Sequence, residues 1–402
     1  MVLTVLSRET ADSRSGFSMN EMRYDWLSDR WVIFAPNRLA RPDDFSASPA
    51  VPPNTIATSC PFCKGSETQT PEPTLVINKP GSNPNQNEWL VRVVPNKFPA
   101  VSHSHPSVSL LYASCLVDPA PINHSPSGHS PENLFLKRFT SGAHEVFIES
   151  PNHVSSITSL PIDHLAVVFQ AYRERLLAWR KLGTMRYGVV FKNYGLDAGA
   201  SLIHSHSQLI CTDFLPSDVF KVQKRMQQYM DEHRRCYVCD VLEQELQSTE
   251  RIVAQNDHYV ALCPFASRLP YSVSIVPKRH QSQFETSTNE NLEDLARIAM
   301  RVLKAFETEH PQASYNTILQ TSPFDLSSNS IFHWRLKIIP RLCKVAGFEW
   351  SSDCFINTVT PEDAARNLRQ RCELMPGHFS ETSDDRYQVA IVPSRTASRS
   401  NA

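Results

Sequence analysis

Three polar side chains suited to chemistry stand two residues apart near the middle of this 402-residue chain: His204, His206 and Gln208. On a β-strand they would share one face, because alternate residues of a strand point the same way. Imidazole can bind a metal ion and can attack phosphorus near neutral pH, where its neutral form is abundant. The pattern therefore predicts a strand on which one histidine binds metal and its neighbour reacts. The alternative is a polar edge strand with solvated histidines.

The composition excludes several classes of protein. Hydrophobic residues at 41% and charged residues at 20% are typical of a soluble globular chain. Lys and Arg number 40 against 41 Asp and Glu, so net charge does not indicate nucleic acid or an anionic membrane as a partner. No apolar run approaches the ~20 residues of a membrane-spanning helix, and the apolar N-terminal stretch is too short for a signal peptide. We expect a cytoplasmic protein that binds neither nucleic acid nor membrane.

Two Cys-x-x-Cys motifs, at 60–63 and 236–239, are suited to metal binding. Each lets two thiolates reach one tetrahedral Zn2+, provided that the chain supplies two more ligands. In a reducing cytoplasm these cysteines are better explained by metal than by disulfides. A redox pair or two buried thiols are the alternatives for either motif alone.

An internal repeat supplies the missing ligands. Each half contains Cys-x-x-Cys, a strand ending in histidine, a long helix, and a later strand that carries histidine. From His153 to His204 is 51 residues, and from His280 to His333 is 53. The repeat predicts two closed, structural Cys2His2 zinc sites. Their ligands are Cys60, Cys63, His153 and His204 in one half, and Cys236, Cys239, His280 and His333 in the other.

The periodic patterns predict an α+β fold built of two tandem modules, each an antiparallel sheet with a long helix packed on it. Apolar residues at helical spacing indicate the long helices at 163–182 and 292–309, and a further helix at 217–235. In the first helix Asp163 is the expected cap. The modules are expected at 21–216 and 217–375, with an inserted loop at 102–138 and disordered tails at 1–20 and 376–402.

The two halves differ where chemistry is expected. The positions that match His206 and Gln208 are occupied by Arg335 and Lys337 in the second half. Gln208 can donate its amide to a phosphoryl oxygen but is a poor proton donor, which favours transfer between two phosphates over hydrolysis. Ser201, in the Gly-Ala-Ser segment before the histidines, can bring its hydroxyl to the phosphates.

Four arginines surround the apolar segment 31–35, and guanidinium groups suit phosphate. A solvated rim explains them equally well. They are Arg23, Arg30, Arg38 and Arg41.

The motif Gly-Ala-Ser-x-x-His-x-His-x-Gln at 199–208 resembles the galactose-1-phosphate uridylyltransferase branch of the histidine-triad superfamily, whose fold is a duplicated histidine-triad module. Other stretches that carry the resemblance are Arg30-Trp-Val32, Arg41-Pro42, Cys60-Pro-Phe-Cys63, Asn96-Lys-Phe-Pro-Ala100, Glu149-Ser-Pro-Asn-His153 and Pro361-Glu-Asp-Ala-Ala-Arg366. Together they span roughly residues 21–372.

The resemblance implies a ping-pong transfer between a nucleoside-diphosphate sugar and a sugar 1-phosphate or phosphate. His206 would attack the α-phosphorus and hold the nucleotide covalently. The resemblance further implies a homodimer, nucleotide contacts from Asn96, Asn193, Ser201 and Gln208, and sugar-phosphate contacts from Arg30 and Lys337.

Two serines depart from the pattern of the uridylyltransferases. These enzymes commonly have His-Pro-His-Gly-Gln, whereas this chain has Ser205 and Ser207 between the same residues. The serine version is more similar to ADP-glucose phosphorylases, which pass AMP to phosphate. We expect a UDP-glucose–hexose-1-phosphate uridylyltransferase, with ADP-glucose phosphorylase as the alternative. Two hypotheses from other functional classes remain: a nucleotide hydrolase, and a zinc-stabilised nucleotide-binding protein without turnover.

Overall fold

The computed structural model describes residues 20–36, 38, 60–82, 88–102, 141–327 and 331–374. The predicted tails and the predicted inserted loop lie outside these ranges, apart from residues 20 and 102.

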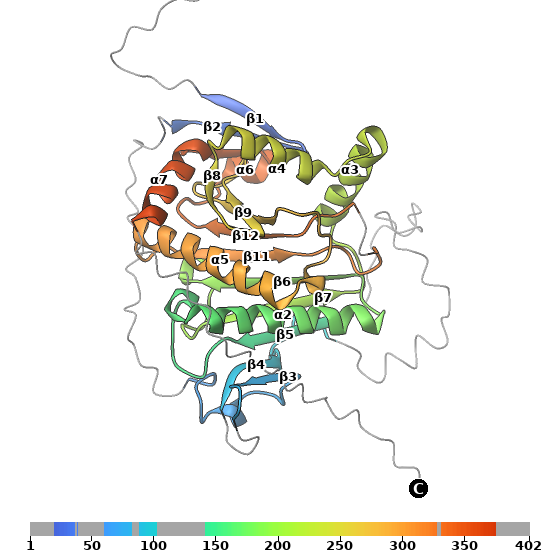
Figure 1. Cartoon of the computed structure of the whole chain (residues 1–402), viewed down its shortest axis with the longest axis vertical. Helices are drawn as coiled ribbons and strands as arrows, with labels where there is room; N and C mark the ends of the chain where they lie inside the picture. The colour runs from blue at the N-terminus through green and yellow to red at the C-terminus, as the bar shows by residue number, and fades with distance from the viewer. Residues whose placement is uncertain are drawn as a thin grey trace, which may run out of the picture.

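A ten-stranded antiparallel sheet forms the centre of the molecule (Figure 1). Its order is β3-β4-β5-β7-β6-β11-β12-β10-β9-β8, so the second half repeats the first in reverse about the β6–β11 pair. The first half contributes β3 (Leu75–Asn78), β4 (Trp89–Pro95), β5 (Gly142–Ile148), β6 (Tyr187–Tyr194) and β7 (His206–Thr212). The second half contributes β8 (Ile252–Gln255), β9 (Tyr259–Leu262), β10 (Val273–Pro277), β11 (Tyr315–Gln320) and β12 (Arg335–Pro340).

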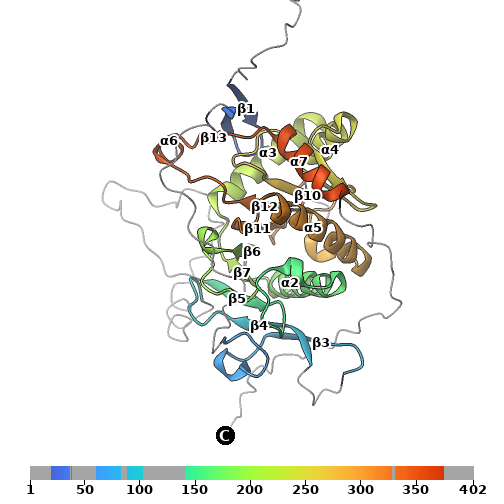
Figure 2. The same cartoon turned by 90° about the vertical axis from the view of Figure 1, so that its left-hand side faces the viewer.

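One face of the sheet is covered by the two long helices, α2 (Ile162–Leu182) and α5 (Asn289–Glu309) (Figure 2). Their apolar residues pack on alternate residues of the strands, such as Leu209 of β7 and Leu336 of β12. α2 ends at Gly183, whose φ of 70° is the left-handed conformation that glycine tolerates best. Asp163 is not the N-cap as expected: Pro161 holds that position, and Asp163 lies in the first turn.

The opposite face is covered unevenly. In the second half, helices α3 (Ser217–His233) and α4 (Tyr237–Ser248) and the turn after β1 pack against Val260, Leu262 and Val276. In the first half, the segment around Phe62 packs against Val94 and Ile148.

A small three-stranded sheet lies next to the second half. It has the order β1 (Glu21–Asp25), β2 (Arg30–Phe34) and β13 (Phe355–Asn357), and α6 (Gly347–Ser352) precedes β13. Helix α7 (Pro361–Glu373) packs against α5. Short 3-10 helices occur at Glu67–Gln69, Ile157–Ser159, Leu196–Ala198 and Phe284–Thr286.

The predicted fold class is therefore confirmed: two antiparallel modules, each with a long helix on one face. Helix α4 was not predicted, because Cys236 to Cys239 looked like a break after α3. No helix in the described ranges combines the length and the apolar character needed to cross a bilayer.

Candidate active site and metal centres

His206 and Gln208 lie on the face of β7 that faces away from α2, while Leu209 and Cys211 of the same strand join the helix-facing core. The prediction that His204 shares this strand face is wrong, because β7 begins only at His206. The backbone before it is held elsewhere: the Ser205 amide donates to the Val154 carbonyl at 2.7 Å. His204 is thereby freed to point toward the loop that follows β5.

The tautomer of His206 is fixed by its own backbone. Nδ1 lies 2.8 Å from the carbonyl oxygen of His204, and a carbonyl can only accept, so Nδ1 carries the proton. Nε2 is left with a free lone pair. The ring of His206 lies 5.4 Å from the ring of Phe62. Burial, and then the positive charge of Lys192, hold the pKa of His206 below its usual value. A neutral imidazole with an unprotonated Nε2 is the form needed for nucleophilic attack.

Gln208 is oriented by a histidine that was not predicted, His144 of β5. The amide of Ala100 donates to His144 Nδ1 at 3.1 Å, so the proton of this neutral ring sits on Nε2 and is donated to Gln208 Oε1 at 2.8 Å. Burial keeps the pKa of His144 below its usual value, which favours that neutral form. Asn96 Nδ2 also approaches Gln208 Oε1, at 3.4 Å. The oxygen of the amide is thus occupied, and its NH2 group remains for a phosphoryl oxygen.

We predict that His144→Phe slows nucleotidyl transfer by about 10- to 100-fold, because an amide that rotates freely no longer presents its NH2 group reliably. The rate of adduct formation on His206 in rapid-quench experiments measures this. His144→Gln is the matched control, since its amide can accept from Ala100 and donate to Gln208, and it should restore most of the rate. Equal rates in both variants would contradict a positioning role.

A buried ion pair lies next to the backbone of His206. Lys192 Nζ of β6 donates to Glu149 Oε2 at 2.6 Å and to the carbonyl of His206 at 3.0 Å. The hydroxyls of Ser205 and Ser207 both donate to the same carboxylate, the former at 2.5 Å. Burial alone would raise the pKa of Glu149, but the charge of Lys192 and these hydrogen bonds outweigh it and hold the pKa below its usual value.

This network explains the two serines that depart from the usual motif. Each satisfies one oxygen of a carboxylate that is 0% exposed, and an unsatisfied buried carboxylate would be costly. The network fixes the backbone at both sides of His206. Sequence reasoning missed it, although Glu149 and Lys192 each end an apolar stretch of a strand with a charge of opposite sign.

Asn193 lies near the end of β6, and Ser201 lies in the connection between β6 and β7. The register of these strands pairs Phe191 with Gln208, and its continuation sets Asn193 opposite His206. Asn193 accepts from Asn316 Nδ2 at 2.8 Å. Ser201 is exposed in the same connection, whose turn requires Gly195: φ is 81°, and a Cβ there would lie 2.2 Å from an oxygen of Ser314.

The first predicted set of metal ligands comes together at the edge of this site. The possible ligand atoms of Cys60, Cys63, His153 and His204 all lie within 4.8 Å of one another. His204 Nδ1 is 3.5 Å from each sulfur, and Cys63 Sγ is 3.3 Å from His153 Nδ1. Neighbouring ligands of a tetrahedral zinc are about 3.5 Å apart, so the set fits that ion. His204 Nε2 donates to the Ser150 carbonyl at 2.9 Å, which fixes the ring for metal binding through Nδ1.

The second set repeats this arrangement. Its ligand atoms also lie within 4.8 Å of one another, with Cys239 Sγ 3.6 Å from Nδ1 of both His280 and His333. His333 Nε2 donates to the Pro277 carbonyl at 3.0 Å, as His204 does to Ser150. Both sets are four-ligand donor sets of the kind that forms closed structural sites.

Arg30 and Lys337 lie away from His206 in the same chain. The registers align Gln208, Phe191, Ile318 and Lys337 in one row across β7, β6, β11 and β12. Lys337 is therefore three strands from Gln208, which is about 14 Å at the usual strand spacing. Arg30, from β2, lines a cavity together with Lys337.

The geometry has a counterpart among known proteins. Residues 11–216 match the family described as galactose-1-phosphate uridyl transferase, N-terminal domain, and residues 139–376 match a domain of unknown function, DUF4921. The first match covers more than half of the chain. The chain belongs to the galactose-1-phosphate uridylyltransferase family. It is therefore an enzyme of the nucleotidyltransferase class.

Two relatives in this family cover nearly the whole chain. ADP-glucose phosphorylase of Arabidopsis thaliana is 31% identical over 354 residues, which are 87% of this chain and 92% of the relative. Galactose-1-phosphate uridylyltransferase of Thermotoga maritima is 29% identical over 363 residues, 88% of this chain and 98% of the relative. The crystal structure of an Arabidopsis ADP-glucose phosphorylase with bound ADP-glucose has a TM-score of 0.70 and 28% identity, covering 88% of this chain and 99% of that chain.

Proposed function

We propose that this family member moves a nucleoside monophosphate from a nucleoside-diphosphate sugar to a second phosphate through a covalent adduct on His206. The observation that carries the proposal is the His206 Nδ1–H donated to its neighbour's carbonyl at 2.8 Å, which leaves Nε2 unprotonated. Nε2 forms a bond to the α-phosphorus as the bond to the sugar phosphate breaks. That phosphate leaves as an anion and needs no proton from Gln208.

The surrounding residues are proposed to bind the nucleotide and its phosphates. The free NH2 group of Gln208 donates to a phosphoryl oxygen, where charge increases during transfer. Asn96 contacts this amide, and Asn193 of β6 and Ser201 of the β6–β7 connection complete the proposed set. We retain a phosphate-binding role for Arg30 and Lys337, and we propose that it is exercised in the cavity that both residues line, away from His206 of the same chain.

The nucleotide base separates two candidate reactions. Our first candidate is uridylyl transfer between UDP-glucose and a hexose 1-phosphate. The second is adenylyl transfer from ADP-glucose to inorganic phosphate. It is favoured by the 31% identity to the Arabidopsis phosphorylase and by Ser205 and Ser207, whose hydroxyls both donate to Glu149.

Parallel incubation with UDP-glucose and ADP-glucose, each labelled in the α-phosphate, tests the proposal. We expect a phosphohistidine adduct at His206 with one of the two sugars, and its discharge by hexose 1-phosphate or by inorganic phosphate identifies the acceptor. Release of free nucleoside monophosphate without acceptor would indicate a hydrolase. Absence of an adduct with both sugars would indicate a binding protein and overturn the proposal.

We further propose that zinc occupies both Cys2His2 sets, where it would fix the Cys60 and Cys236 segments and perform no chemistry, since all four positions are taken by protein. Thiolate ligands of this kind fit a reducing compartment, which supports a cytoplasmic location. A homodimer, implied by the resemblance, is a further proposal that light scattering on the purified chain can check.

A further inference from the structure

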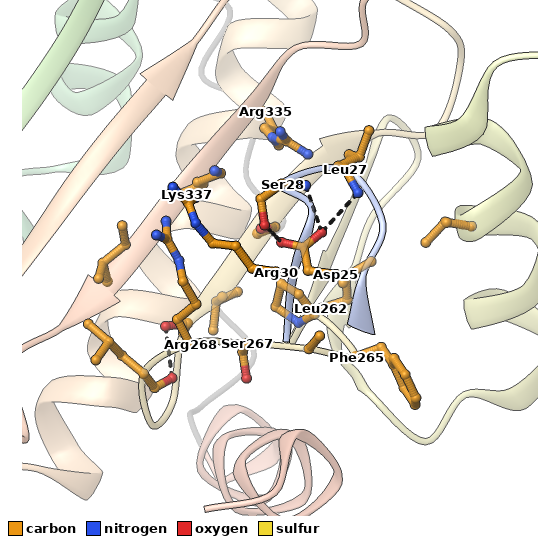
Figure 3. Close-up of a pocket in the computed structure, with 18 of the residues that line it drawn as sticks. Asp25, Leu27, Ser28, Arg30, Leu262, Phe265, Ser267, Arg268, Arg335 and Lys337 are labelled. Atoms are coloured by element: carbon orange, nitrogen blue, oxygen red, sulfur yellow. Dashed lines mark hydrogen bonds between the residues drawn. The ribbon is translucent and has the colours of Figure 1, made fainter. Parts of the chain in front are cut away.

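The second half of the sheet carries a cavity of about 730 Å³ on the face opposite α5 (Figure 3). Its floor is β12, and its walls come from the β1–β2 hairpin, α3, α4 and the loop between β9 and β10. This volume lies within the usual range for small-molecule sites, about 300–1,000 Å³. Apolar side chains such as Val222, Val238 and Leu262 line one part, and Trp350 of α6 lines another.

The cavity is the second module's counterpart of the nucleotidyl site. His333 precedes β12 as His204 precedes β7, and both donate Nε2–H to a backbone carbonyl. Two residues later, Arg335 takes the position of His206, and Lys337 takes that of Gln208. The second module thus has two cations where the first has His206 and Gln208.

Three neighbouring cations of this cavity, Arg268, Arg335 and Lys337, lack a carboxylate partner among the described residues. Lys221 and Arg341 also line the cavity without a carboxylate partner there, and Arg341 donates to the side chain of Asn316. Lys337 forms no hydrogen bond or ion pair there, Arg268 only stacks on the ring of Phe355 at 5.2 Å, and Arg335 donates only to Gln320 at 3.3 Å. Arg30, in contrast, is neutralised by Asp218 and Asp353.

The carboxylate of Asp25 lines the same cavity, but it is already engaged. It accepts from the amides of Leu27 and Ser28 at 3.1 and 3.3 Å and from the Ser28 hydroxyl at 2.5 Å. Figure 3 shows Asp25 held within this turn, with Arg268, Arg335 and Lys337 around it. Seven Lys and Arg side chains line the cavity against three carboxylates, those of Asp25, Asp218 and Glu245, so positive charge is in excess.

Unpaired cations in a shielded cavity are costly for the folded protein. Burial, followed by the charges of Arg335 and Arg268, holds the pKa of Lys337 well below its usual range, and Asp25 and Asp218 only partly oppose this. A bound dianion would remove that cost, because it pairs with all three cations in a low-dielectric setting.

We propose that this cavity binds a small phosphomonoester, with the phosphate between Arg268, Arg335 and Lys337 and the rest of the molecule against the apolar wall. A phosphomonoester carries about −1.5 to −2 at neutral pH, which suits a cavity with an excess of positive charge. Lys337 lies three strands, or about 14 Å, from Gln208 on the same sheet, and neither His206 nor Gln208 lines the cavity.

Titration calorimetry on the full chain tests the proposal. The His206→Asn background prevents adduct formation, and saturating UDP-glucose plus ADP-glucose fills the nucleotidyl site. Glucose 1-phosphate, AMP and inorganic phosphate are then titrated separately, which distinguishes a sugar phosphate, a nucleotide and the bare anion. We expect one equivalent of at least one of the two esters to bind. Lys337→Met and Arg268→Met should each weaken it by about 10- to 100-fold.

Lys304→Met is the matched control, because Lys304 is exposed on α5, on the opposite side of the sheet, and carries the same charge. It should bind as tightly as the parent. Lys337→Met should also melt at the same or a higher temperature, since it removes an unpaired cation, so weaker binding cannot be attributed to unfolding. Binding by inorganic phosphate alone would limit the site to the bare anion and overturn the phosphomonoester assignment.

Proton uptake gives an independent readout. Because the dianion raises the pKa of Lys337 toward its usual value, binding takes up protons in the pH range where Lys337 of the free protein is partly deprotonated. In that range the measured enthalpy should change with the ionisation enthalpy of the buffer. The other charges that face Lys337 are Arg335, Arg268, Asp25 and Asp218. Equal affinities in the Lys337→Met and Lys304→Met variants would refute the site. Because no step uses a His206 adduct, this outcome is separate from failure of the proposed transfer reaction.

Discussion

His206→Asn is expected to abolish nucleotidyl transfer, with a loss of about 10⁴-fold or more in kcat, because no other group on this strand face offers an unprotonated nitrogen to phosphorus. Asparagine keeps the approximate size of the ring, and its amide can still donate to the His204 carbonyl, the bond that His206 makes at 2.8 Å. We therefore expect the variant to remain folded, to retain its metal and to bind nucleotide sugar without forming an adduct. Turnover assays and intact-mass spectrometry check these results.

His233→Asn provides the control for this substitution. His233 lies at the end of α3 with its side chain 53% exposed, so the change should leave both turnover and adduct formation intact. Adduct formation that persists in His206→Asn would show that another residue is the nucleophile.

Cys236→Ser is expected to remove one of about two zinc ions per chain and to lower the melting temperature by about 10 °C or more. Structural zinc contributes directly to folding free energy, and a serine hydroxyl is a poor ligand for it. Cys236 is the N-cap residue of α4, so its loss should loosen the packing of Val238 and Leu242 on the second half of the sheet. Metal analysis by mass spectrometry and calorimetric melting measure the two effects.

Two further variants make this test specific. Cys354 lies outside both clusters, so Cys354→Ser should leave metal content unchanged. Cys63→Ser should remove the other ion and also slow adduct formation, because its cluster includes His204, whose carbonyl accepts from His206. Cys236→Ser should spare the adduct. An unchanged zinc content in Cys236→Ser would contradict the second site.

The repeat was the most informative feature of the sequence. Its matched intervals correctly predicted that His153 and His204 join Cys60 and Cys63, because ligands repeated at equal spacing in two halves indicate one geometry used twice. The helices α2 and α5 were also predicted, since their apolar periodicity is long. The limits of these elements were less certain: β7 and β12 begin two residues after the metal histidines, which period-two spacing alone cannot reveal.

The supporting residues could not be predicted, because strand pairing determines them. His144 reaches Gln208 only through the β5–β7 register, which pairs His144 with Ile210 and Val146 with Gln208. Glu149 and Lys192 meet next to the backbone of His206 from two different strands. The spacing of residues along the chain does not predict contacts between side chains of different strands. The partner of a buried charge is found only when the order of the strands is known.

The unbroken β6–β11 pair has a consequence for turnover. Six residue pairs join the two modules here, from Tyr194 with Tyr315 to Val189 with Gln320. Because the modules share one continuous sheet, they cannot rotate apart about a hinge. Entry and release of substrates must then depend on side chains and connecting segments on the face of the sheet opposite α2 and α5. The His206 site and the cavity of the second module are therefore expected to keep a constant separation throughout the catalytic cycle.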